Sequence, residues 1–503
     1  MWTINQALES AARKFGDQPA IIDGERHIAY GELEAYVRAA TAWLQAQGIG
    51  KGDKIALQGR NTLAWIVNYY AALRAGAVAV PINHKLAPAE TAYILAHSES
   101  RLLLVDHDVY REDANRDTAL PVFSLTRSDA PADPPAAPPA TGVDDAPEPV
   151  ACTDTDLAEL LYTSGTTGKP KACMHSHANV LLAGIASSLV YGLSPDDRVL
   201  LAMPVWHSFP LNNQLVASHY LGAAVVLLPE YHPQHFLETV QAQRCTLFFG
   251  PPVAYSMPLQ KVPDFDTYDL SSIRAWLYGG GPIDETMART LIQRYRSDRF
   301  YQVFGMTETG PTGTALRPDE QIAKAGSIGR WPVSGCDLAV MKNDAREAGP
   351  GEVGEIWMRC QSIMQGYYRD PESTANAFHG EWYRTGDLVR VDDDGYLFIV
   401  DRLRDMIITG GENVYSREVE NVLAELPGIR EAAVIGRPDP EWGQTVVAYA
   451  VPTQSGRPDP ETLRRQCEPL LARYKIPREI RFVDALPRTP TGKVMKYKLR
   501  DAY

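Results

Sequence analysis

The stretch LLYTSGTTGKPKACMHSH at residues 160–177 combines glycines, hydroxyl side chains and lysines between two apolar segments. Backbone amides, hydroxyls and ammonium groups are the groups that hold a polyphosphate. A Walker-type loop needs the spacing G-x-x-x-x-G-K-[ST]. Here only two residues separate Gly165 from Gly168, and Pro170 follows Lys169. The sequence therefore predicts a phosphate-holding loop that is not of the Walker type.

Three further short clusters carry acids, hydroxyls or bases close to glycines. They are YQVFGMTET at 301–309, YRTGD at 383–387 with DRLRD at 401–405, and RTPTGKVMK at 488–496. Any one such cluster is most often a turn or a solvated surface. Together with the loop at 163–171, they indicate one site built from segments that are far apart in the sequence.

The elements that must position these clusters follow an alternating pattern. Strand-like runs such as DKIALQG and AVAVPIN alternate with helical patterns between residues 30 and 105. The alternation resumes with RVLLAMP, AAVVLLP, CTLFFGPP, IRAWLYGG and RFYQVFG, and PIDETMARTLIQRYR is one of the helical segments between them. This order predicts an α/β fold with doubly wound, mostly parallel sheets. The Ala-, Pro- and Asp-rich segment 127–150 predicts an extended connector.

The character of the chain changes near residue 326. Short strands with Gly-rich turns follow, and DDDGY at 392–396 is a hairpin signal, so we expect a small barrel-like module over about 326–400. From Asp401 onward helices and strands are mixed, as in REVENVLAEL and TVVAYAVP. We therefore expect a large N-terminal domain at 1–400 and a small α+β C-terminal domain at 401–503.

Composition and charge exclude several classes of protein. Hydrophobic residues make up 45% and charged residues 22%, as in globular proteins, and no apolar run is long enough to span a membrane. The first residues lack the order of an export signal, so we expect a cytoplasmic protein. The net charge of −13 argues against a general nucleic-acid binder. Nothing in the sequence indicates an oligomeric state.

Cysteines and local charge give two further expectations. The six cysteines are scattered, with no C-x-x-C pair, which predicts reduced thiols and no disulfide or zinc site. Residues 464–500 contain eleven Lys or Arg against three acids, so this end of an acidic chain is suited to an anionic ligand.

In this order and at these separations, the four clusters resemble the adenylate-forming superfamily, which includes acyl-CoA synthetases, firefly luciferase and the adenylation domains of nonribosomal peptide synthetases. The resemblance extends over essentially the whole chain. It implies that ATP activates a carboxylic acid as an acyl-adenylate, and that the acyl group then passes to a thiol. It further implies ATP, Mg²⁺ and CoA as ligands, a mobile C-terminal domain and an AMP-forming acid:CoA ligase.

The resemblance also assigns the nucleotide site. The phosphate-binding loop is Thr163, Ser164, Gly165, Thr166, Thr167, Gly168 and Lys169. The backbone wall beside the nucleotide is Gly279, Gly280 and Gly281, where glycine lets a ligand approach the main chain. Glu308 matches the magnesium-binding acid and Thr307 a phosphate-contacting hydroxyl, while Phe304 takes the place of the usual adenine-stacking Tyr. One well-placed carboxylate suffices for Mg²⁺ when phosphate oxygens complete its coordination.

The remaining implied residues belong to the ribose, the C-terminal domain and the thiol. Asp387 and Arg402 match ribose contacts, and Lys493 matches the lysine that reaches the reacting carboxylate and α-phosphate. The hinge position is Arg404, where relatives usually carry Asp or Lys. Gly410 and Gly411 match the loop that lines the pantetheine tunnel.

The acid itself is the part that the sequence specifies least. His207 takes the position beside the carboxylate, and Trp206, Phe209, Val253, Tyr255 and Met306 predict a mainly apolar pocket. An aryl or medium-chain aliphatic acid suits such a pocket. No acid stands where amino-acid-activating relatives hold the substrate ammonium. The alternatives are an enzyme that loads a carrier-protein phosphopantetheine and a catalytically silent acyl-nucleotide binding protein.

Overall fold

The computed structural model describes residues 1–109, 120–125, 148–163, 170–342, 346–454, 456–488 and 494–501. The described residues form two compact units. The first contains residues up to 163, residues 170–338 and Met358–Tyr383. The second contains Ala339–Trp357 and the chain from Arg384 onward. Each unit is described by itself below.

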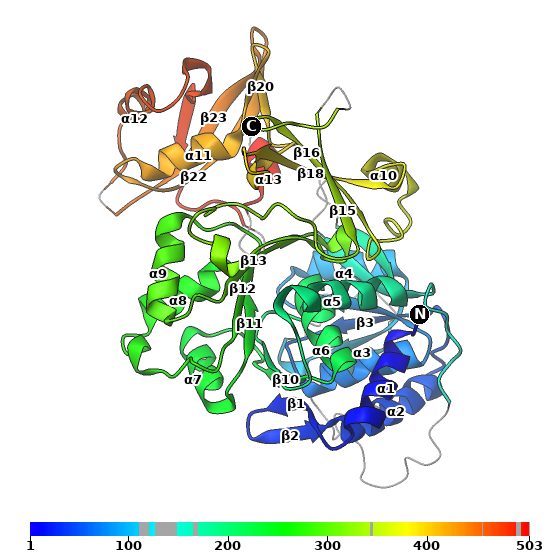
Figure 1. Ribbon diagram of the computed structural model, residues 1–503. Coiled ribbons are helices and arrows are strands. Elements are labelled where there is room, and N and C mark those ends of the chain that lie inside the picture. The colour runs from blue at the N-terminus through cyan, green and yellow to red at the C-terminus, as the bar shows by residue number, and fades with distance from the viewer. Residues whose placement is uncertain are drawn as a thin grey trace. The chain divides into compact units, whose positions relative to one another are not determined.

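The first unit contains two large sheets (Figure 1). The eight-stranded sheet has the order β14-β13-β12-β11-β9-β10-β1-β2. Its strands are β1 Pro19–Asp23, β2 Arg26–Ala29, β9 Arg198–Leu201, β10 Ala224–Leu227, β11 Leu247–Gly250, β12 Ala275–Gly279, β13 Phe300–Gly305 and β14 Gly313–Leu316. The six-stranded sheet has the order β6-β5-β3-β4-β7-β8. Its strands are β3 Lys54–Gln58, β4 Val78–Ile82, β5 Ser100–Val105, β6 Val122–Ser124, β7 Leu157–Thr163 and β8 Lys171–Ser176.

Both sheets are parallel in their interior and antiparallel at an edge. In the eight-stranded sheet the pairs from β1 to β13 are parallel, and β1·β2 and β13·β14 are antiparallel. In the six-stranded sheet only β7·β8 is antiparallel among the described pairs. Helix α1 precedes the first strand, and the other helices of this unit lie between strands along the chain. The helices are α1 Ile4–Phe15, α2 Tyr30–Ala46, α3 Leu63–Arg74, α4 Pro88–Ser98, α5 His177–Tyr191, α6 Ala217–Leu221, α7 Pro233–Gln243, α8 Pro252–Lys261 and α9 Glu285–Tyr295.

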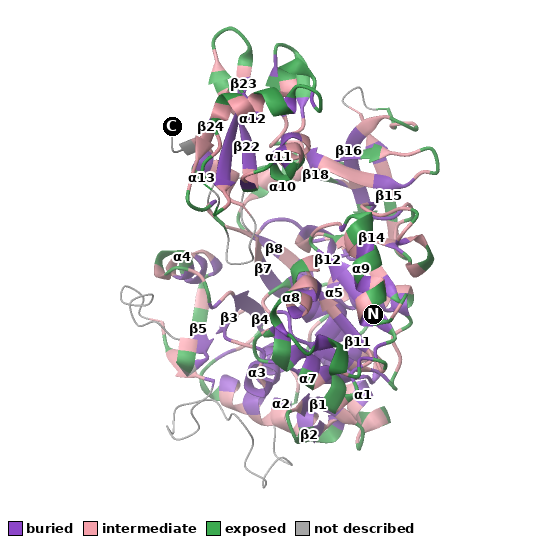
Figure 2. Ribbon diagram, turned by 90° about the vertical axis from the view of Figure 1, so that its left-hand side faces the viewer, coloured by how far each residue is buried: buried purple, intermediate pink, exposed green. Residues whose placement is uncertain are grey.

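Strand alternation divides the core of this unit between the two faces of the eight-stranded sheet. Ile21 faces α1, α2, α3 and the six-stranded sheet, whereas its neighbour Ile22 faces α7, α8 and α9. Leu201 and Leu200 divide in the same way, because successive strand side chains point to opposite faces. Figure 1 shows α7, α8 and α9 along one face, and Figure 2 shows that the central strands are buried. This two-sided burial is typical of a doubly wound sheet.

A third sheet has five strands, and the boundary between the two units runs through it. Its strands are β15 Cys336–Met341, β16 Val353–Cys360, β17 Phe378–His379, β18 Trp382–Val391 and β19 Leu397–Arg402, and α10 Pro371–Ala377 precedes β17. The hairpin expected at 392–396 is confirmed, since β18 and β19 pair antiparallel on either side of it. The positive φ of Gly395, +81°, is the conformation that such a turn needs from glycine.

The C-terminal part of the second unit is a five-stranded sheet with helices on both faces. Its strands are β20 Ile407–Thr409, β21 Glu412–Val414, β22 Ile429–Asp439, β23 Gly443–Pro452 and β24 Glu479–Phe482. Helices α11 Ser416–Glu425 and α12 Pro460–Cys467 pack on one face, and α13 Lys496–Asp501 lies on the other. Lys496 of α13 forms an ion pair with Glu420 of α11 at 2.7 Å.

The expected fold class is confirmed: a large α/β unit with doubly wound sheets, a small β module and a smaller α+β part. The proposed boundary at residue 400 stays a prediction. Most of the segment 127–150 lies outside the described residues. Among the residues that the structure describes, no helix is both long and apolar enough to cross a membrane. All six cysteines are free thiols.

Candidate functional site

Glu308 lies in a single 3-10 turn, Thr307–Thr309, directly after β13. Its side chain is nearly buried, and the hydroxyl of Tyr367 donates a hydrogen bond to its Oε1 at 3.1 Å. The backbone also holds the turn, because the amide of Met364 donates to the Glu308 carbonyl at 2.9 Å. The carboxylate is therefore fixed in position from both its side chain and its main chain.

Three buried hydroxyls brace the same turn from behind. Thr309 Oγ1 accepts from the Met306 amide at 3.1 Å and donates to the Thr312 carbonyl at 2.6 Å. Thr312 Oγ1 and Ser362 Oγ are 2.7 Å apart, and both contact the Thr309 carbonyl. Residues 309, 312 and 362 are at most 2% exposed. A buried network in which each hydroxyl has partners rigidifies the backbone that it joins.

The surroundings of Glu308 respond to its charge. Burial raises the pKa of the Tyr367 hydroxyl, and repulsion by the Glu308 carboxylate raises it further. The Cys173 thiol beside them has its pKa raised well above the ordinary value, by burial first and by Glu308 second. Tyr367 and Cys173 therefore remain protonated next to the carboxylate, and Tyr367 can act as a donor to it.

The oxygen donors at Glu308 and Thr307 fit Mg²⁺, the ion that the family resemblance implies. Mg²⁺ uses one or two protein carboxylates and completes its octahedron with water and phosphate oxygens. Glu308 is a single, rigidly held carboxylate, and the neighbouring Thr307 adds a half-buried hydroxyl. This is a suitable arrangement for an ion that is shared with a polyphosphate.

The glycines at the end of β12 leave the main chain accessible. A Cβ at Gly279 would lie 2.8 Å from the carbonyl oxygen of Val303, so only glycine fits between β12 and β13 here. Gly280 has φ +79°, and neither Gly280 nor Gly281 has an atom within 4 Å of a built Cβ. The residues expected to form a backbone wall are thus a close-packed glycine followed by two open ones.

The segment that carries His207 meets the Glu308 turn. Ser208 Oγ and Thr307 Oγ1 are 3.1 Å apart. The ring of His207 packs against that of Trp206 with centroids 4.2 Å apart and planes tilted by 36°, and desolvation lowers the pKa of the imidazole below its ordinary value. The ring is therefore neutral at pH 7, when one of its nitrogens is a donor and the other an acceptor. The structure thus brings His207 and Thr307 into one neighbourhood.

A π-helix, Phe209–Val216, begins two residues after His207, with Ser208 as its N-cap. All of its residues from Pro210 to Val216 are buried, although three consecutive ones are the amides Asn212, Asn213 and Gln214. Phe209 stacks on Phe249 of β11 with ring centroids 4.1 Å apart. π-helices are rare and occur often at functional sites, because their wide turn places side chains that an α-helix would space differently.

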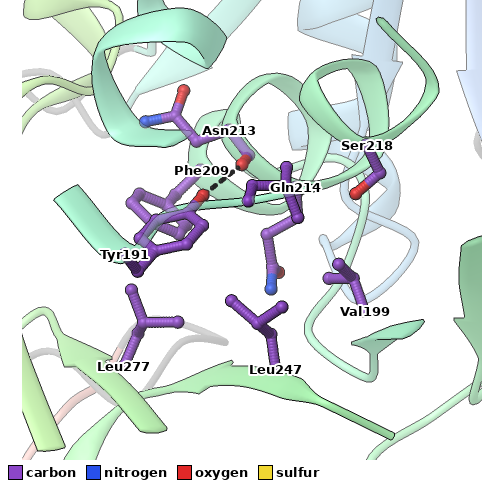
Figure 3. A pocket seen from close by; sticks show the side chains of 9 residues that line it. Tyr191, Val199, Phe209, Asn213, Gln214, Ser218, Leu247 and Leu277 are labelled. Atoms are coloured by element: carbon purple, nitrogen blue, oxygen red, sulfur yellow. Dashed lines mark hydrogen bonds between the residues drawn. The ribbon is translucent and has the colours of Figure 1, made fainter. Parts of the chain in front are cut away.

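Two small cavities lie beside this π-helix, and Phe209 and Tyr191 line both of them. The first spans about 220 Å³ of empty space, part of it open to solvent, between α5, the π-helix and strands β9, β11 and β12 (Figure 3). Its lining residues are Tyr191, Leu193, Val199, Phe209, Asn213, Gln214, Ser218, Leu247 and Leu277. The second spans about 250 Å³ of empty space, part of it open to solvent, and reaches Val303, Phe304 and the Thr312 region. The cavities therefore connect the His207 segment with the strand that leads to Glu308.

The residues expected to line an acyl pocket divide into two groups. Phe209 lines both cavities, and Phe304, expected at the adenine, lines the second. Val253 and Tyr255 line neither cavity. Val253 is 53% exposed, and Tyr255 is completely buried in the core beneath α7, α8 and α9. The physical reason is the helical geometry of α8, which turns these two side chains to different sides, and neither side faces the cavities.

Two further expected residues, Trp206 and Met306, are half-buried. Met306 packs against the cluster of Cys173, Met364, Tyr367 and Tyr383 that surrounds Glu308. Trp206 packs against His207, as described above. Both therefore lie next to the candidate site without lining either cavity.

In the second unit, Asp387 and Arg402 lie opposite each other on β18 and β19. Arg402 Nε is 2.9 Å from Asp387 Oδ1, and the aspartate is 3% exposed while a third of the arginine side chain is exposed. The two expected ribose contacts thus form one ion pair, in which the arginine fixes the carboxylate.

The other expected residues of this unit lie between β19 and β21. Arg404 follows β19, and its carbonyl accepts from Arg500 of α13. Gly410 and Gly411 form the turn between β20 and β21 with φ +58° and +85°. A Cβ at Gly410 would lie 2.8 Å from the ring of Trp442, whereas nothing lies within 4 Å of one at Gly411. Only the second glycine therefore has open space beside it.

Several expected residues lie outside the described part of the chain. These are Ser164, Gly165, Thr166, Thr167, Gly168, Lys169 and Lys493. Thr163 is described: it ends β7 and pairs with Lys171 of β8. The roles assigned to Thr163 and to these undescribed residues stay predictions.

Comparisons with known proteins agree with this arrangement of elements. The chain matches the AMP-binding enzyme family over residues 8–368 and the AMP-binding enzyme C-terminal domain over residues 418–493. The chain belongs to the AMP-binding enzyme family. It is therefore an adenylate-forming enzyme, as the resemblance of its motifs predicted.

Relatives within the AMP-binding enzyme family match nearly the whole chain. It is 36% identical to a feruloyl-CoA synthase of an Amycolatopsis species over 500 residues, which is 99% of each chain. It is 34% identical to a long-chain-fatty-acid–CoA ligase of Mycobacterium tuberculosis, covering 95% of this chain and 93% of that one. Its fold matches the o-succinylbenzoate CoA synthetase of Bacillus subtilis, solved with its acyl-adenylate intermediate, with a TM-score of 0.88, 29% identity and coverage of 99% and 98%.

Within this AMP-binding enzyme, the motifs missed the residues that shape the cavities. Tyr191, Asn213, Gln214 and Ser218 belong to no family motif used above. The hydroxyls of Thr312 and Ser362 behind Glu308 were also missed. The sequence did contain one signal, which is the three consecutive amides in the apolar run FPLNNQLVASHY. Burying polar side chains is unfavourable unless they are hydrogen-bonded, so three amides in a buried helix indicate a specific role.

Proposed function

We propose that this AMP-forming acid:CoA ligase activates an aryl or medium-chain aliphatic acid, using Glu308, Thr307 and His207 around the reacting groups. The observation that carries the proposal is the 3.1 Å contact between Ser208 and Thr307. It joins the turn of the magnesium-type carboxylate to the segment that borders the cavities. The match to acid:CoA ligases over 99% of the chain supports the reaction class.

The first step forms the acyl-adenylate. A carboxylate oxygen of the acid attacks the α-phosphorus of ATP, the bond from that phosphorus to the bridging oxygen breaks, and pyrophosphate leaves with its electron pair. Two anions must approach each other, so catalysis consists mainly of charge neutralisation and alignment. Mg²⁺ bound to the polyphosphate and Glu308 would neutralise part of that charge.

The residues of the first unit then act on the acid and the phosphates. Thr307 donates its hydroxyl to a phosphate oxygen, and Ser208 keeps that hydroxyl oriented. His207, which is neutral at pH 7, donates an N–H to the substrate carboxylate. Because the ring carries no positive charge, it does not reduce the nucleophilicity of the carboxylate as an ion pair would. Tyr367 keeps the Glu308 carboxylate pointed in one direction.

The remaining roles follow from the family resemblance and from the second unit. Asp387, held by Arg402, accepts hydrogen bonds from the ribose hydroxyls. The loop Thr163 to Lys169 holds the leaving pyrophosphate, and Lys493 stabilises the negative charge at the α-phosphate. In the second step the CoA thiol attacks the acyl carbonyl and AMP leaves. Gly411 gives the pantetheine arm room, Arg404 is the hinge, and the basic residues of 464–500 suit the CoA phosphates.

We also propose a reducing compartment, the cytoplasm, because six free thiols suit it. The competing acceptor is a phosphopantetheine on a carrier protein, since it presents the same thiol arm as CoA. An acid panel tested by pyrophosphate release, with CoA or a holo-carrier as acceptor, decides between them. Thioester formation with CoA supports the proposal. Turnover with the carrier alone, or ATP binding without pyrophosphate exchange for any acid, would overturn it.

Two variants test the division of labour between the half-reactions. Lys493→Ala should lower adenylate formation about 100-fold or more, but leave thioester formation from a supplied acyl-adenylate nearly intact. Gly411→Leu should do the reverse and let the adenylate accumulate, because its side chain fills space that is open in the fold. Equal damage to both half-reactions by either variant would contradict the assignment.

A further inference from the structure

The wall of the first cavity is mostly apolar, but two of its buried side chains, Gln214 and Ser218, present polar atoms without partners. Gln214 is 3% exposed and Ser218 is fully buried. Neither Gln214 Oε1 nor Ser218 Oγ has a hydrogen-bond partner among the residues that the structure describes. Buried polar atoms are almost always hydrogen-bonded, so two unpaired ones in one cavity wall call for a ligand.

The two side chains are placed to act together. Gln214 lies in the π-helix and Ser218 in α6, four positions further along a continuous helical segment, so both can face the same side. Figure 3 shows the Gln214 amide extending into the space above Val199 and Leu247, with the Ser218 hydroxyl turned toward the same space.

The neighbouring buried amides make hydrogen bonds through their nitrogens, although the Asn212 and Asn213 amide oxygens lack partners among the described residues. Asn212 donates to Glu159 at 3.1 Å, and Asn213 Nδ2 donates to Ser187 and to the Pro311 carbonyl. The hydroxyl of Tyr191 donates to the Asn213 carbonyl at 3.0 Å. Of the polar groups without partners in this segment, Gln214 Oε1 and Ser218 Oγ face the cavity, whereas Figure 3 shows the Asn213 amide pointing away from Val199 and Leu247.

The remaining wall defines the rest of the ligand. Val199, Leu247, Leu277 and the rings of Tyr191 and Phe209 surround the cavity, and none of the described residues that line it is charged. A second carboxylate or an ammonium group would therefore be buried without a counter-charge, which is strongly unfavourable. An uncharged hydroxyl matches the pair, since it can donate to Gln214 Oε1 and accept from Ser218.

We propose that Gln214 and Ser218 select carboxylic acids whose apolar body, a ring or a short alkyl chain, carries a hydroxyl at the end away from the carboxylate. The inference rests on the proposed function, because it places the acid body in the cavity beside His207. Gln214 and Ser218 are then specificity-determining residues of the adenylation step, and they make no contact with the reacting atoms.

The test compares matched acids on the full-length enzyme with CoA and MgATP. The pairs are para-hydroxycinnamate and cinnamate, para-hydroxybenzoate and benzoate, and ω-hydroxyoctanoate and octanoate. Para-methylcinnamate is included because it fills the same volume without a hydrogen bond. For at least one pair, kcat/KM measured by pyrophosphate release should be about tenfold or more higher for the hydroxylated acid. The methyl analogue should behave like the unsubstituted acid.

The double variant Gln214→Leu with Ser218→Ala should remove this preference. Its kcat/KM should fall about tenfold or more for the hydroxylated acid and rise for the unsubstituted one, because the apolar acid then meets an apolar wall. A folding defect cannot give this inversion, since it would lower both values together. Ser188→Ala is the matched control: its buried hydroxyl bonds the Gly184 carbonyl and does not line the cavity, so the preference should be unchanged.

The outcomes separate the inference from the function on which it rests. If acids are activated but every hydroxylated acid equals its partner, the inference is wrong and the proposed function stands. If the double variant keeps the preference, the hydroxyl is recognised elsewhere and the inference is wrong. If no acid yields pyrophosphate, the proposed function fails and the inference fails with it.

Discussion

The hydroxyl network behind Glu308 should be measurable both as stability and as catalysis. In the variant Thr309→Val the side-chain volume stays nearly the same, but the hydroxyl is lost. The Met306 amide then loses its acceptor at 3.1 Å and the Thr312 carbonyl its donor at 2.6 Å. Each buried group left without a partner costs about 1–3 kcal/mol, so we expect the loss of two partners to lower the free energy of unfolding by about 2–6 kcal/mol.

The same change should loosen the turn that carries Thr307 and Glu308. A displacement of about 1 Å at a catalytic group can cost about 100-fold in rate. We therefore expect ATP–pyrophosphate exchange by Thr309→Val to fall at least about tenfold, chiefly through kcat/KM for MgATP. Urea unfolding followed by tryptophan fluorescence gives the stability, and isotope exchange gives the rate.

Thr309→Ser is the matched control for both measurements. It keeps the hydroxyl and removes one methyl group, which costs about 1 kcal/mol. Its exchange rate should remain near that of the wild type. Equal stability and equal exchange in Thr309→Val and Thr309→Ser would refute the reasoning, because the methyl group and not the hydroxyl would then determine the position of the turn.

Two further predictions concern groups away from the reacting atoms. Lys496→Met should destabilise the second unit by about 3 kcal/mol, because it leaves Glu420, 19% exposed and paired with Lys496 at 2.7 Å, without its counter-charge. Urea unfolding measures this, and Glu420→Leu added to Lys496→Met should restore most of the loss; no recovery would contradict the pairing argument. Burial lowers the pKa of His219 from 6.5 to about 4. Between pH 6.5 and pH 4 the unfolded chain therefore binds more protons than the folded protein, and the free energy of unfolding falls as the pH is lowered through this range. His219 should account for about 3 kcal/mol of that loss at pH 4, and unfolding of His219→Gln across this range should be less pH-dependent by that amount.

Much of the fold followed from the sequence because strand and helix periods differ. The buried runs at β9, β10 and β11 are short and apolar on both faces, which is how a strand covered by helices on both sides must look. The hairpin at 392–396 was predicted by its turn residues. The hairpin also explains why Asp387 and Arg402, which belong to two separate sequence motifs, form an ion pair across β18 and β19.

The cavity walls could not be predicted in the same way. Helical propensity does not distinguish a π-helix from an α-helix. No pattern in the sequence therefore predicted that Gln214 and Ser218 would face the same cavity. Tyr255 shows the opposite case. Its aromatic type is suited to a pocket, but the direction of α8 places it in the core, and that direction depends on packing between elements.

The π-helix beside His207 has a consequence for how such an enzyme can change over generations. One turn of a π-helix holds about one residue more than a turn of an α-helix. Deleting a single residue between Phe209 and Val216 would let the segment relax to ordinary helix, with α6 and the elements after it left in place. Side chains within the shortened segment, Gln214 among them, would then take new positions against the cavity, while Ser218, the strands and the Glu308 turn stayed in place. A one-codon deletion is therefore a short route from one preferred acid to another.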